Sequence, residues 1–110
     1  MVQECTLHEQ MILLSIYRLG DDAYGVPIRA NVMEITGRNL HFGTLYNTLD
    51  KLVKKGLVKT QRGEPTGERG GRSRIYYSLT DPGLEALENA RELHSALWKG
   101  IPDLLFGEQP

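Results

Sequence analysis

The sequence predicts a mainly α-helical fold that contains one small β-hairpin, which is an α+β arrangement. The chain begins with three segments whose apolar residues have helical spacing and continues with two short alternating segments on either side of a glycine-rich stretch. It ends with one long helical segment. At 110 residues the chain has the size of one domain, and such a domain buries somewhat over ~60% of the surface that its unfolded chain exposes. One hydrophobic core without disulfides is therefore expected.

The first two predicted helices are marked by local signals. Thr6 and Glu9 have the spacing of a capping box, so the first helix should run from about Leu7 to Leu19. The second helix should span about 24–36, with Pro27 in its first turn, where a missing backbone N–H costs nothing.

The third helix and the hairpin follow from a change in period. The helix should span roughly Gly43 to Lys55, and Gly56 closes it as a left-handed cap. From Leu57 to Arg62, and again from Ser73 to Leu79, the side chains alternate as they do in strands. The polar residues 63–72 between them form a glycine-rich loop, the wing of the hairpin.

A fourth helix completes the predicted fold. It should start after Thr80, with Pro82 near its first position, and continue to about Lys99. The succession helix, helix, helix, strand, wing, strand, helix is that of a winged helix-turn-helix. We therefore expect such a domain over residues 1–80, followed by a C-terminal helix and tail over residues 81–110.

Short motifs also occur in a definite order along nearly the whole chain. They are Tyr24-Gly25, Gly43-Thr44-Leu45-Tyr46 with Leu49 and Leu52, Gly56-Leu57-Val58, and Gly70-Gly71-Arg72 through Tyr76-Tyr77-Ser78-Leu79-Thr80 with Gly83. In this order they resemble the PadR family of bacterial transcriptional regulators, and the single C-terminal helix is similar to its compact subgroup. Phe42 departs from the family pattern, in which a proline commonly precedes the glycine. The resemblance implies a dimeric regulator of transcription, usually a repressor.

The charge distribution favours a polyanionic partner, although the net charge is only -1. Between Arg38 and Arg74 there are nine basic and three acidic residues, so this segment carries +6, while the remainder carries -7. Such asymmetry indicates a face that binds a polyanion. The alternative is a solvated basic surface without a partner.

One face of the third predicted helix has the composition of a DNA recognition helix. Projection at 100° per residue turns an apolar face toward the core, made by Leu45, Tyr46, Leu49, Leu52 and Val53. The other face carries small polar residues first and lysines afterwards. Small polar residues can reach base edges in the major groove, with Asn47 suited to an adenine, while cations further along meet phosphates. The alternative is an ordinary amphipathic surface helix.

The wing and its strands add basic residues that can contact a second stretch of DNA backbone. The predicted residues that bind double-stranded DNA are Tyr24, Thr44, Tyr46, Asn47, Thr48, Lys51, Lys54, Lys55, Arg69, Arg72 and Arg74. The two tyrosines are included on the family resemblance, and a half-buried tyrosine with its hydroxyl at the rim is the alternative for each. The competing function is a winged-helix module that binds another protein and would not need the basic segment.

The fourth predicted helix has an apolar surface over half of its circumference, wider than the stripe of about 100° that covers one core. A second subunit is the simplest partner for this surface. The predicted residues of a homodimer interface are Leu84, Leu87, Ala90, Leu93, Leu97 and Trp98. In the alternative, a monomer covers the same surface with its first helix and with residues 104–106.

Trp98, His94 and Arg91 share this half of the helix and suggest an effector pocket between the subunits. A flat apolar ring beside cationic or titratable groups suits a small planar aromatic or cationic ligand. The competing interpretation is that Trp98 packs the dimer seam.

Other chemistries find little support in the sequence. Cys5 and His8 have C-x-x-H spacing, but no second paired motif exists, so no metal site is expected and an inert thiol is preferred. No nucleophile has an evident base, so neither an enzyme nor a cofactor is expected.

The sequence contains no basic and apolar leader and no apolar run long enough to span a bilayer. A cytoplasmic protein without membrane contact is therefore expected.

Overall fold

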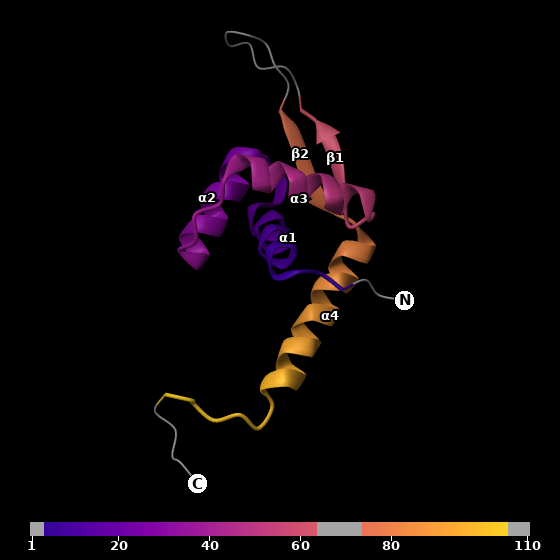
Figure 1. Cartoon of the computed structure of the whole chain (residues 1–110). Coiled ribbons are helices and arrows are strands. Elements are labelled where there is room, and N and C mark those ends of the chain that lie inside the picture. Colours follow the sequence, from indigo (N-terminus) through magenta and orange to yellow (C-terminus); the bar gives the residue numbers. More distant parts are fainter. Residues whose placement is uncertain (1–3, 64–73, 106–110) are drawn as a thin grey trace.

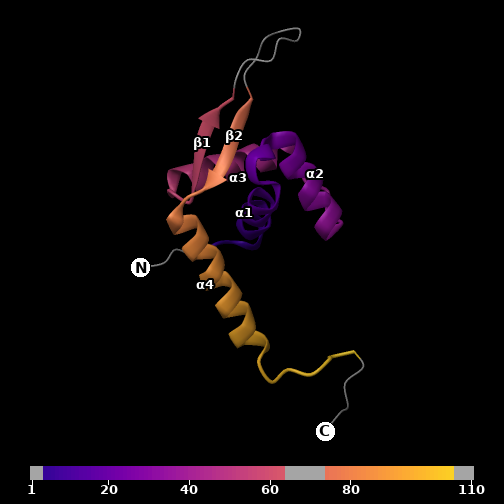
Figure 2. The same ribbon diagram turned by 180° about the vertical axis from the view of Figure 1, so that it is seen from behind.

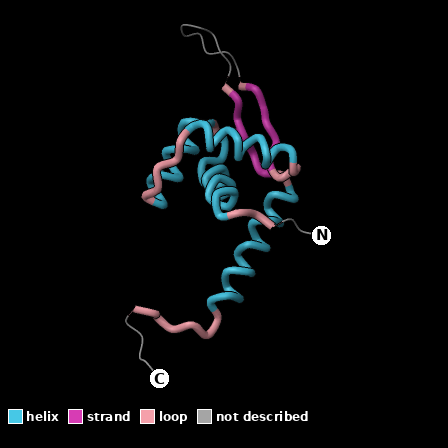
Figure 3. The backbone as a smooth tube through the Cα atoms, viewed as in Figure 1, coloured by secondary structure: helices cyan, strands magenta, loops and turns pink. Residues whose placement is uncertain are grey.

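The computed structural model describes residues 4–63 and 74–105 of the chain. In chain order, the elements are α1 (Leu7–Leu19), a short 3-10 turn (Gly20–Asp22), α2 (Gly25–Thr36), α3 (Phe42–Lys54), β1 (Val58–Arg62), β2 (Ile75–Leu79) and α4 (Asp81–Trp98), as shown in Figures 1 and 3. This arrangement confirms the predicted α+β class. The third helix begins and ends one residue earlier than predicted: His41 is its N-cap and Lys55 is its C-cap.

Local caps fix the ends of α1. The Glu9 amide donates to Thr6 Oγ1 at 3.1 Å, and the Thr6 amide donates to Glu9 Oε1 at 2.8 Å, which is the predicted capping box. At the other end, Gly20 has a φ of 58°, a conformation that favours glycine. The helix is therefore bounded by the same residues that the sequence indicated.

The hairpin is a two-stranded antiparallel sheet whose register pairs Val58 with Leu79 and Arg62 with Ile75. The second strand begins at Ile75, and the predicted start at Ser73 lies outside the described residues. The Tyr77 amide donates to the carbonyl of Ala23 at 2.8 Å, which ties β2 to the start of α2. The hairpin is thus anchored to the helical body beside the point where α2 begins.

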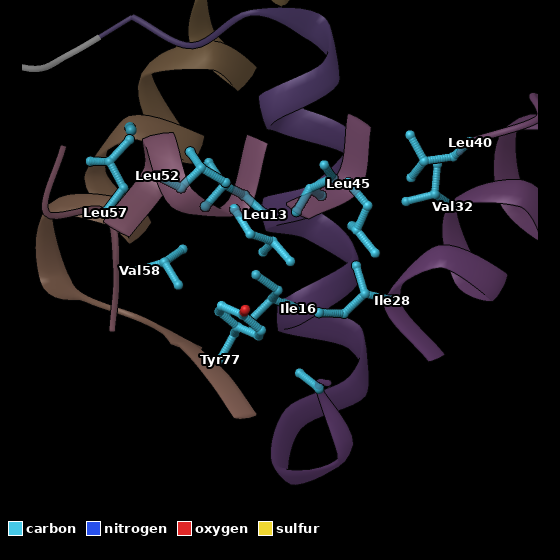
Figure 4. Packing of buried hydrophobic residues seen from close by; sticks show 14 residues of the cluster. Leu13, Ile16, Ile28, Val32, Leu40, Leu45, Leu52, Leu57, Val58 and Tyr77 are labelled. Carbon is cyan, nitrogen blue, oxygen red and sulfur yellow. The ribbon is translucent and has the colours of Figure 1, made fainter. Parts of the chain in front are cut away.

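The core lies around α1, which packs against α2, α3 and α4. Figure 4 shows Leu13 and Ile16 of α1 meeting Ile28 of α2 and Leu45 of α3, with Tyr77 of β2 closing one side. The core is continuous from α2 to the hairpin, so α3 and the hairpin are held in a fixed relation.

Only the first half of α4 belongs to this core. Ala86 and Ala90 are buried, whereas every residue from Arg91 to Leu105 is exposed. Figures 1 and 2 show α4 leaving the body below the hairpin and projecting away from it. Among residues 4–63 and 74–105, no helix is both long enough and apolar enough to cross a membrane.

Candidate nucleic-acid interface

Helix α3 has one buried and one exposed face, as predicted. The side chains of Leu45, Leu49 and Leu52 are fully buried, while Thr44, Asn47, Lys51 and Lys54 are exposed. Buried leucines at this spacing prevent the helix from rotating about its axis. The exposed polar residues therefore form a fixed row that runs from the first turn to the last.

Three residues of α3 differ from the projection. Tyr46 and Val53, which were predicted to face the core, are 44% and 37% exposed, because the core ends before it reaches their side of the helix. Thr48 is half-buried, and its hydroxyl donates to the carbonyl oxygen of Thr44 at 2.9 Å. The hydroxyl proton of Thr48 is thus engaged within the helix, and its methyl group is the part best suited to a thymine methyl.

Tyr46 lies against the start of α2. A Cβ built on Gly25 would come within 2.1 Å of the Tyr46 hydroxyl, so glycine is needed for this close approach. Behind it, burial raises the pKa of the Tyr77 phenol, and the neighbouring Tyr46 and Asp50 add to that shift. A neutral Tyr77 is therefore maintained beneath the α3 surface well above physiological pH.

Phe42 and Arg29 form a second contact between α2 and α3. The rings of Phe42 and Tyr46 stack at 6.2 Å with an interplanar angle of 19°. The guanidinium carbon of Arg29 lies 4.6 Å from the centre of the Phe42 ring, and Arg29 Nε donates to the carbonyl of Leu40. The connection between the two helices is thus held by side chains from both.

The base of the hairpin joins a cation to two aromatic rings. The guanidinium carbon of Arg74 lies 4.5 Å from the centre of the Tyr24 ring, and Tyr24 meets Tyr76 edge to face at 5.5 Å. Lys59 and Arg62 are exposed on β1. The predicted wing residues Arg69 and Arg72 lie outside the described residues.

Lys55 has a partner within the chain. Its ammonium lies 2.6 Å from Glu9 Oε2, and the Glu9 side chain is almost completely buried. Burial alone would raise the pKa of Glu9, but the hydrogen bonds from Lys55 and Thr6 outweigh it and hold the pKa below its ordinary value. This ion pair gives Lys55 a structural role within the chain, in addition to its predicted contact with DNA.

A groove of about 700 Å³ lies between α1 and α4. Its apolar lining includes Leu14 and Tyr17 from α1 and Leu84 from α4, all of them exposed in the single chain. His94 Nε2 is 3.0 Å from Gln10 Oε1 across this groove. The groove opens along the side of α4 that the sequence analysis assigned to association.

The sequence matches the family model of the transcriptional regulator PadR-like family over residues 12–89. The chain belongs to this family. Among curated proteins no relative matches it. It is accordingly a regulator of transcription with a DNA-binding winged helix, and not an enzyme.

Solved structures agree with the PadR assignment. A PadR family transcription regulator from Clostridium difficile R20291 is 27% identical, with a TM-score of 0.66 over 84% of this chain and 92% of its own. A transcriptional regulator from Clostridium thermocellum is 27% identical, with a TM-score of 0.70 and coverages of 88% and 91%. The H. salinarum RosR complex hsRosR-S4 is 27% identical, with a TM-score of 0.67 and coverages of 92% and 80%. The winged helix-turn-helix predicted from the order of elements is thereby confirmed.

In this PadR-family chain the predicted dimer residues fall into two groups. Leu84, Leu93, Leu97 and Trp98 are exposed, whereas Ala90 is buried and Leu87 is half-buried against the chain's own core. The exposed group can contact another subunit without any change in the fold. Ala90 and Leu87 already pack within their own subunit.

The three predicted effector residues are only partly brought together. His94 and Arg91 line the α1/α4 groove, and Arg91 Nε lies 3.6 Å from Glu88 Oε2. Trp98 lies one turn beyond His94, is 60% exposed and is not part of the groove lining. A pocket that joins all three would need a surface from outside the single chain.

Cys5 and His8 belong to no candidate metal site among residues 4–63 and 74–105. In the described part of the chain no three side chains of His, Cys, Asp or Glu come together as a cluster that could bind a metal. Burial and the neighbouring Glu9 raise the pKa of the Cys5 thiol, although Lys55 acts in the opposite direction. A protonated thiol is the poorer nucleophile and metal ligand.

Two residues at the contact between α2 and α3, Arg29 and Phe42, were not among the predicted site residues. The i, i+4 spacing of Phe42 and Tyr46 was available in the sequence and could have suggested their stacking. The contact of Arg29 with Phe42 and Leu40 carried no such signal, because it depends on how α2 and α3 cross.

Proposed function

We propose that this PadR-family protein binds double-stranded operator DNA with α3 in the major groove and the hairpin on the adjacent backbone. The observation that carries the proposal is the row of exposed polar residues on α3 above three fully buried leucines. A helix held in this way presents the same side chains in the same order to every DNA site, which sequence-specific binding requires.

The residues of the row have different roles in the proposal. Asn47 bonds the edge of an adenine, and Thr44 near it contacts a phosphate or a thymine methyl, as does the methyl group of Thr48. Lys51 and Lys54 contact phosphate oxygens.

The hairpin side supplies a second set of contacts. Arg74 at its base, with Arg69 and Arg72 of the wing, contacts the neighbouring phosphates or the minor groove. Tyr24 and Tyr46 border the DNA between the helix and the hairpin.

The exposed half of α4 supports a homodimer. Leu93, Leu97 and Trp98 form an apolar surface that nothing in the described part of the chain covers. Exposed apolar side chains that gather along one helix are typical of an interface. A two-fold axis through α4 would place two recognition helices about 34 Å apart, one turn of DNA, so residues 1–80 bind the operator and residues 81–110 pair the subunits.

The proposed mode of regulation is repression relieved by a small molecule. The support is the groove between α1 and α4, whose apolar wall suits a planar aromatic compound, while the ring of Trp98 beyond it suits a cationic one. Trp98 at the subunit interface would complete this binding site. A ligand bound there would favour one arrangement of the two subunits over another. The protein would act in the cytoplasm, where bacterial operators are found.

Binding of the purified protein to the DNA upstream of its own gene tests this function directly. We expect protection of a pseudo-palindromic site, with affinity that falls steeply as salt rises. A protein that binds a partner protein with no salt dependence, and binds no DNA fragment above the non-specific level, would identify it as a protein-interaction module.

A further inference from the structure

We propose that Arg29 is a positioning residue that sets the angle at which α3 enters the DNA, and that it acts through Phe42 without touching DNA. The inference rests on the proposed DNA-binding function and assigns it a residue outside the predicted contact set. Its structural basis is a closed series of contacts between the first two turns of α2 and the start of α3.

The series begins in α2, from the segment Gly25–Arg29. Arg29 reaches across the connection and donates its Nε proton to the carbonyl of Leu40, two residues before α3 begins. Its guanidinium group lies over the ring of Phe42, the first residue of α3, at 4.6 Å. A planar guanidinium can stack on the ring while its Nε–H donates to the carbonyl, whereas an ammonium group has no planar face that stacks.

The series then returns to α2 through the aromatic stack. Phe42 stacks on Tyr46 one turn later, and the hydroxyl of Tyr46 lies against Gly25. The first turn of α3 is therefore held at two points by residues of α2 that are themselves one turn apart. Two points of attachment fix both the distance and the angle between the helices.

Within the first turn of α3, Leu45 is buried in the core, whereas the three residues before it are exposed. His41 occupies the N-cap position, but its side chain makes no capping hydrogen bond. An uncapped helix start is free to fray. The Arg29–Phe42 contact therefore supplies the order that a cap would otherwise give, close to Thr44 at the start of the exposed row.

The location of Phe42 separates this role from a direct contact with DNA. At 100° per residue, Phe42 lies roughly 160° around the helix from the middle of the row formed by Asn47 and Lys51. A guanidinium stacked on Phe42 is thus directed to the side of α3 that faces away from the proposed base contacts. Loss of Arg29 should change the position of α3 and leave the number of phosphate contacts unchanged.

The test compares Arg29→Ala, Arg29→Lys, Phe42→Ala, Phe42→Tyr and the double alanine variant, with Arg18→Ala as the control on the exposed surface of α1. Operator affinity is measured at several salt concentrations. We expect Arg29→Ala and Phe42→Ala each to weaken binding about tenfold with an unchanged slope of log K on log salt. The double variant should lose no more operator affinity than either single variant, because both substitutions remove the same contact. Phe42→Tyr should retain affinity, and Arg29→Lys should not restore it.

A direct phosphate contact would give the opposite pattern and overturn the proposal: Arg29→Lys would restore binding, and Arg29→Ala would lower the slope by about one unit. Losses of operator affinity that are additive in the double variant would also contradict the proposal.

The Arg29 Nε–H resonance of the free protein provides a readout without DNA. We expect a slowly exchanging signal that moves on Phe42→Ala; a signal that exchanges as fast as that of Arg18 would refute the contact itself. If the wild type binds no DNA, the proposed function fails, and this resonance still decides whether Arg29 orders α3.

Discussion

Glu9 stabilises two parts of the fold with one carboxylate. One oxygen accepts the Thr6 amide and closes the capping box of α1, and the other accepts the Lys55 ammonium beyond the end of α3. Because Lys55 lies 46 residues further along the chain, this single side chain joins the beginning of the domain to the end of the recognition helix.

Glu9→Gln tests this link through its pH dependence. The pKa of Glu9 is lowered in the folded protein, so its contribution to stability is present above the unfolded pKa of about 4.3 and is lost as pH falls through the lower folded value. At pH 7 we expect the variant to be less stable by about 1 kcal/mol, since glutamine keeps the Thr6 contact but loses the charge. Urea unfolding between pH 7 and pH 3 should show the two proteins converging at low pH, and a constant difference would contradict the assignment.

Some contacts of single residues were predictable from the sequence, and others were not. The capping box of Thr6 and Glu9 was predictable because both partners lie in one turn. The exposure of Tyr46 was not, because a helical projection gives a direction but not the distance to which the core extends. The ion pair of Lys55 with Glu9 was not predictable either, because the two residues lie 46 positions apart and no local signal joins them.

At the scale of elements, the end of α3 is joined closely to the start of α4. Thr80 Oγ1 donates to the carbonyl of Gly56 at 2.6 Å and accepts the amide of Gly83 at 3.1 Å. A Cβ on Gly83 would come within 2.1 Å of the carbonyl oxygen of Leu57. Helix α4 therefore approaches the backbone of Leu57 directly at Gly83, where no side chain can move aside to absorb a change.

Gly83→Ala should destabilise the protein strongly. The added methyl group meets a backbone carbonyl that cannot move aside, so we expect a loss of about 2–3 kcal/mol despite the better helix propensity of alanine.

Gly43→Ala is the matched control, because Gly43 also lies in the first turn of a helix and a Cβ there meets nothing within 4 Å. It should be neutral or stabilising in thermal unfolding. Equal effects of the two substitutions would show that the α3/α4 junction is not closely packed.

The element bounds could be read from the sequence because caps and glycines are local signals. Helices α1 and α2 have the predicted bounds almost unchanged, and Gly56 has the expected left-handed backbone with a φ of 77°. The shape of the contact between α2 and α3 could not be read in this way. It depends on Arg29 and Phe42, which have no local signal that joins them.

At the scale of the whole molecule, the exposed half of α4 is the feature that a single chain does not explain. Leu97 is 64% exposed although it lies on the predicted apolar side of α4. The width of this apolar surface was predictable from the sequence, and the structure divides the surface into a part that packs within the chain and a part that does not. The surface that covers the exposed part of α4 belongs to the assembly, so the sequence of one chain does not predict it.

Leu97→Asp should convert the proposed dimer to a monomer. Because Leu97 makes little contact within its own chain, the substitution should leave the fold of the subunit intact, as checked by circular dichroism. Glu92→Gln, on the polar side of the same helix, is the control and should remain dimeric. Sedimentation equilibrium distinguishes the two outcomes, and an unchanged dimer in Leu97→Asp would place the interface elsewhere.

Trp98 gives an optical test of the proposed effector pocket. A planar aromatic compound that binds beside Trp98 should quench its fluorescence at the concentrations that release DNA. Trp98→Phe should bind the same compound more weakly in calorimetry. Compounds that release DNA without quenching Trp98 would show that the effector site lies away from the end of α4.

The salt dependence of operator binding by Lys51→Ala shows whether the exposed row of α3 contacts DNA. Lys99→Ala, an exposed lysine that follows the distant end of α4, is the control. We expect Lys51→Ala to bind more weakly and to flatten the slope of log K against log salt by about one unit, the loss of one phosphate contact, while Lys99→Ala retains the wild-type slope. Identical slopes in all three proteins would contradict the claim and remove α3 from the DNA interface.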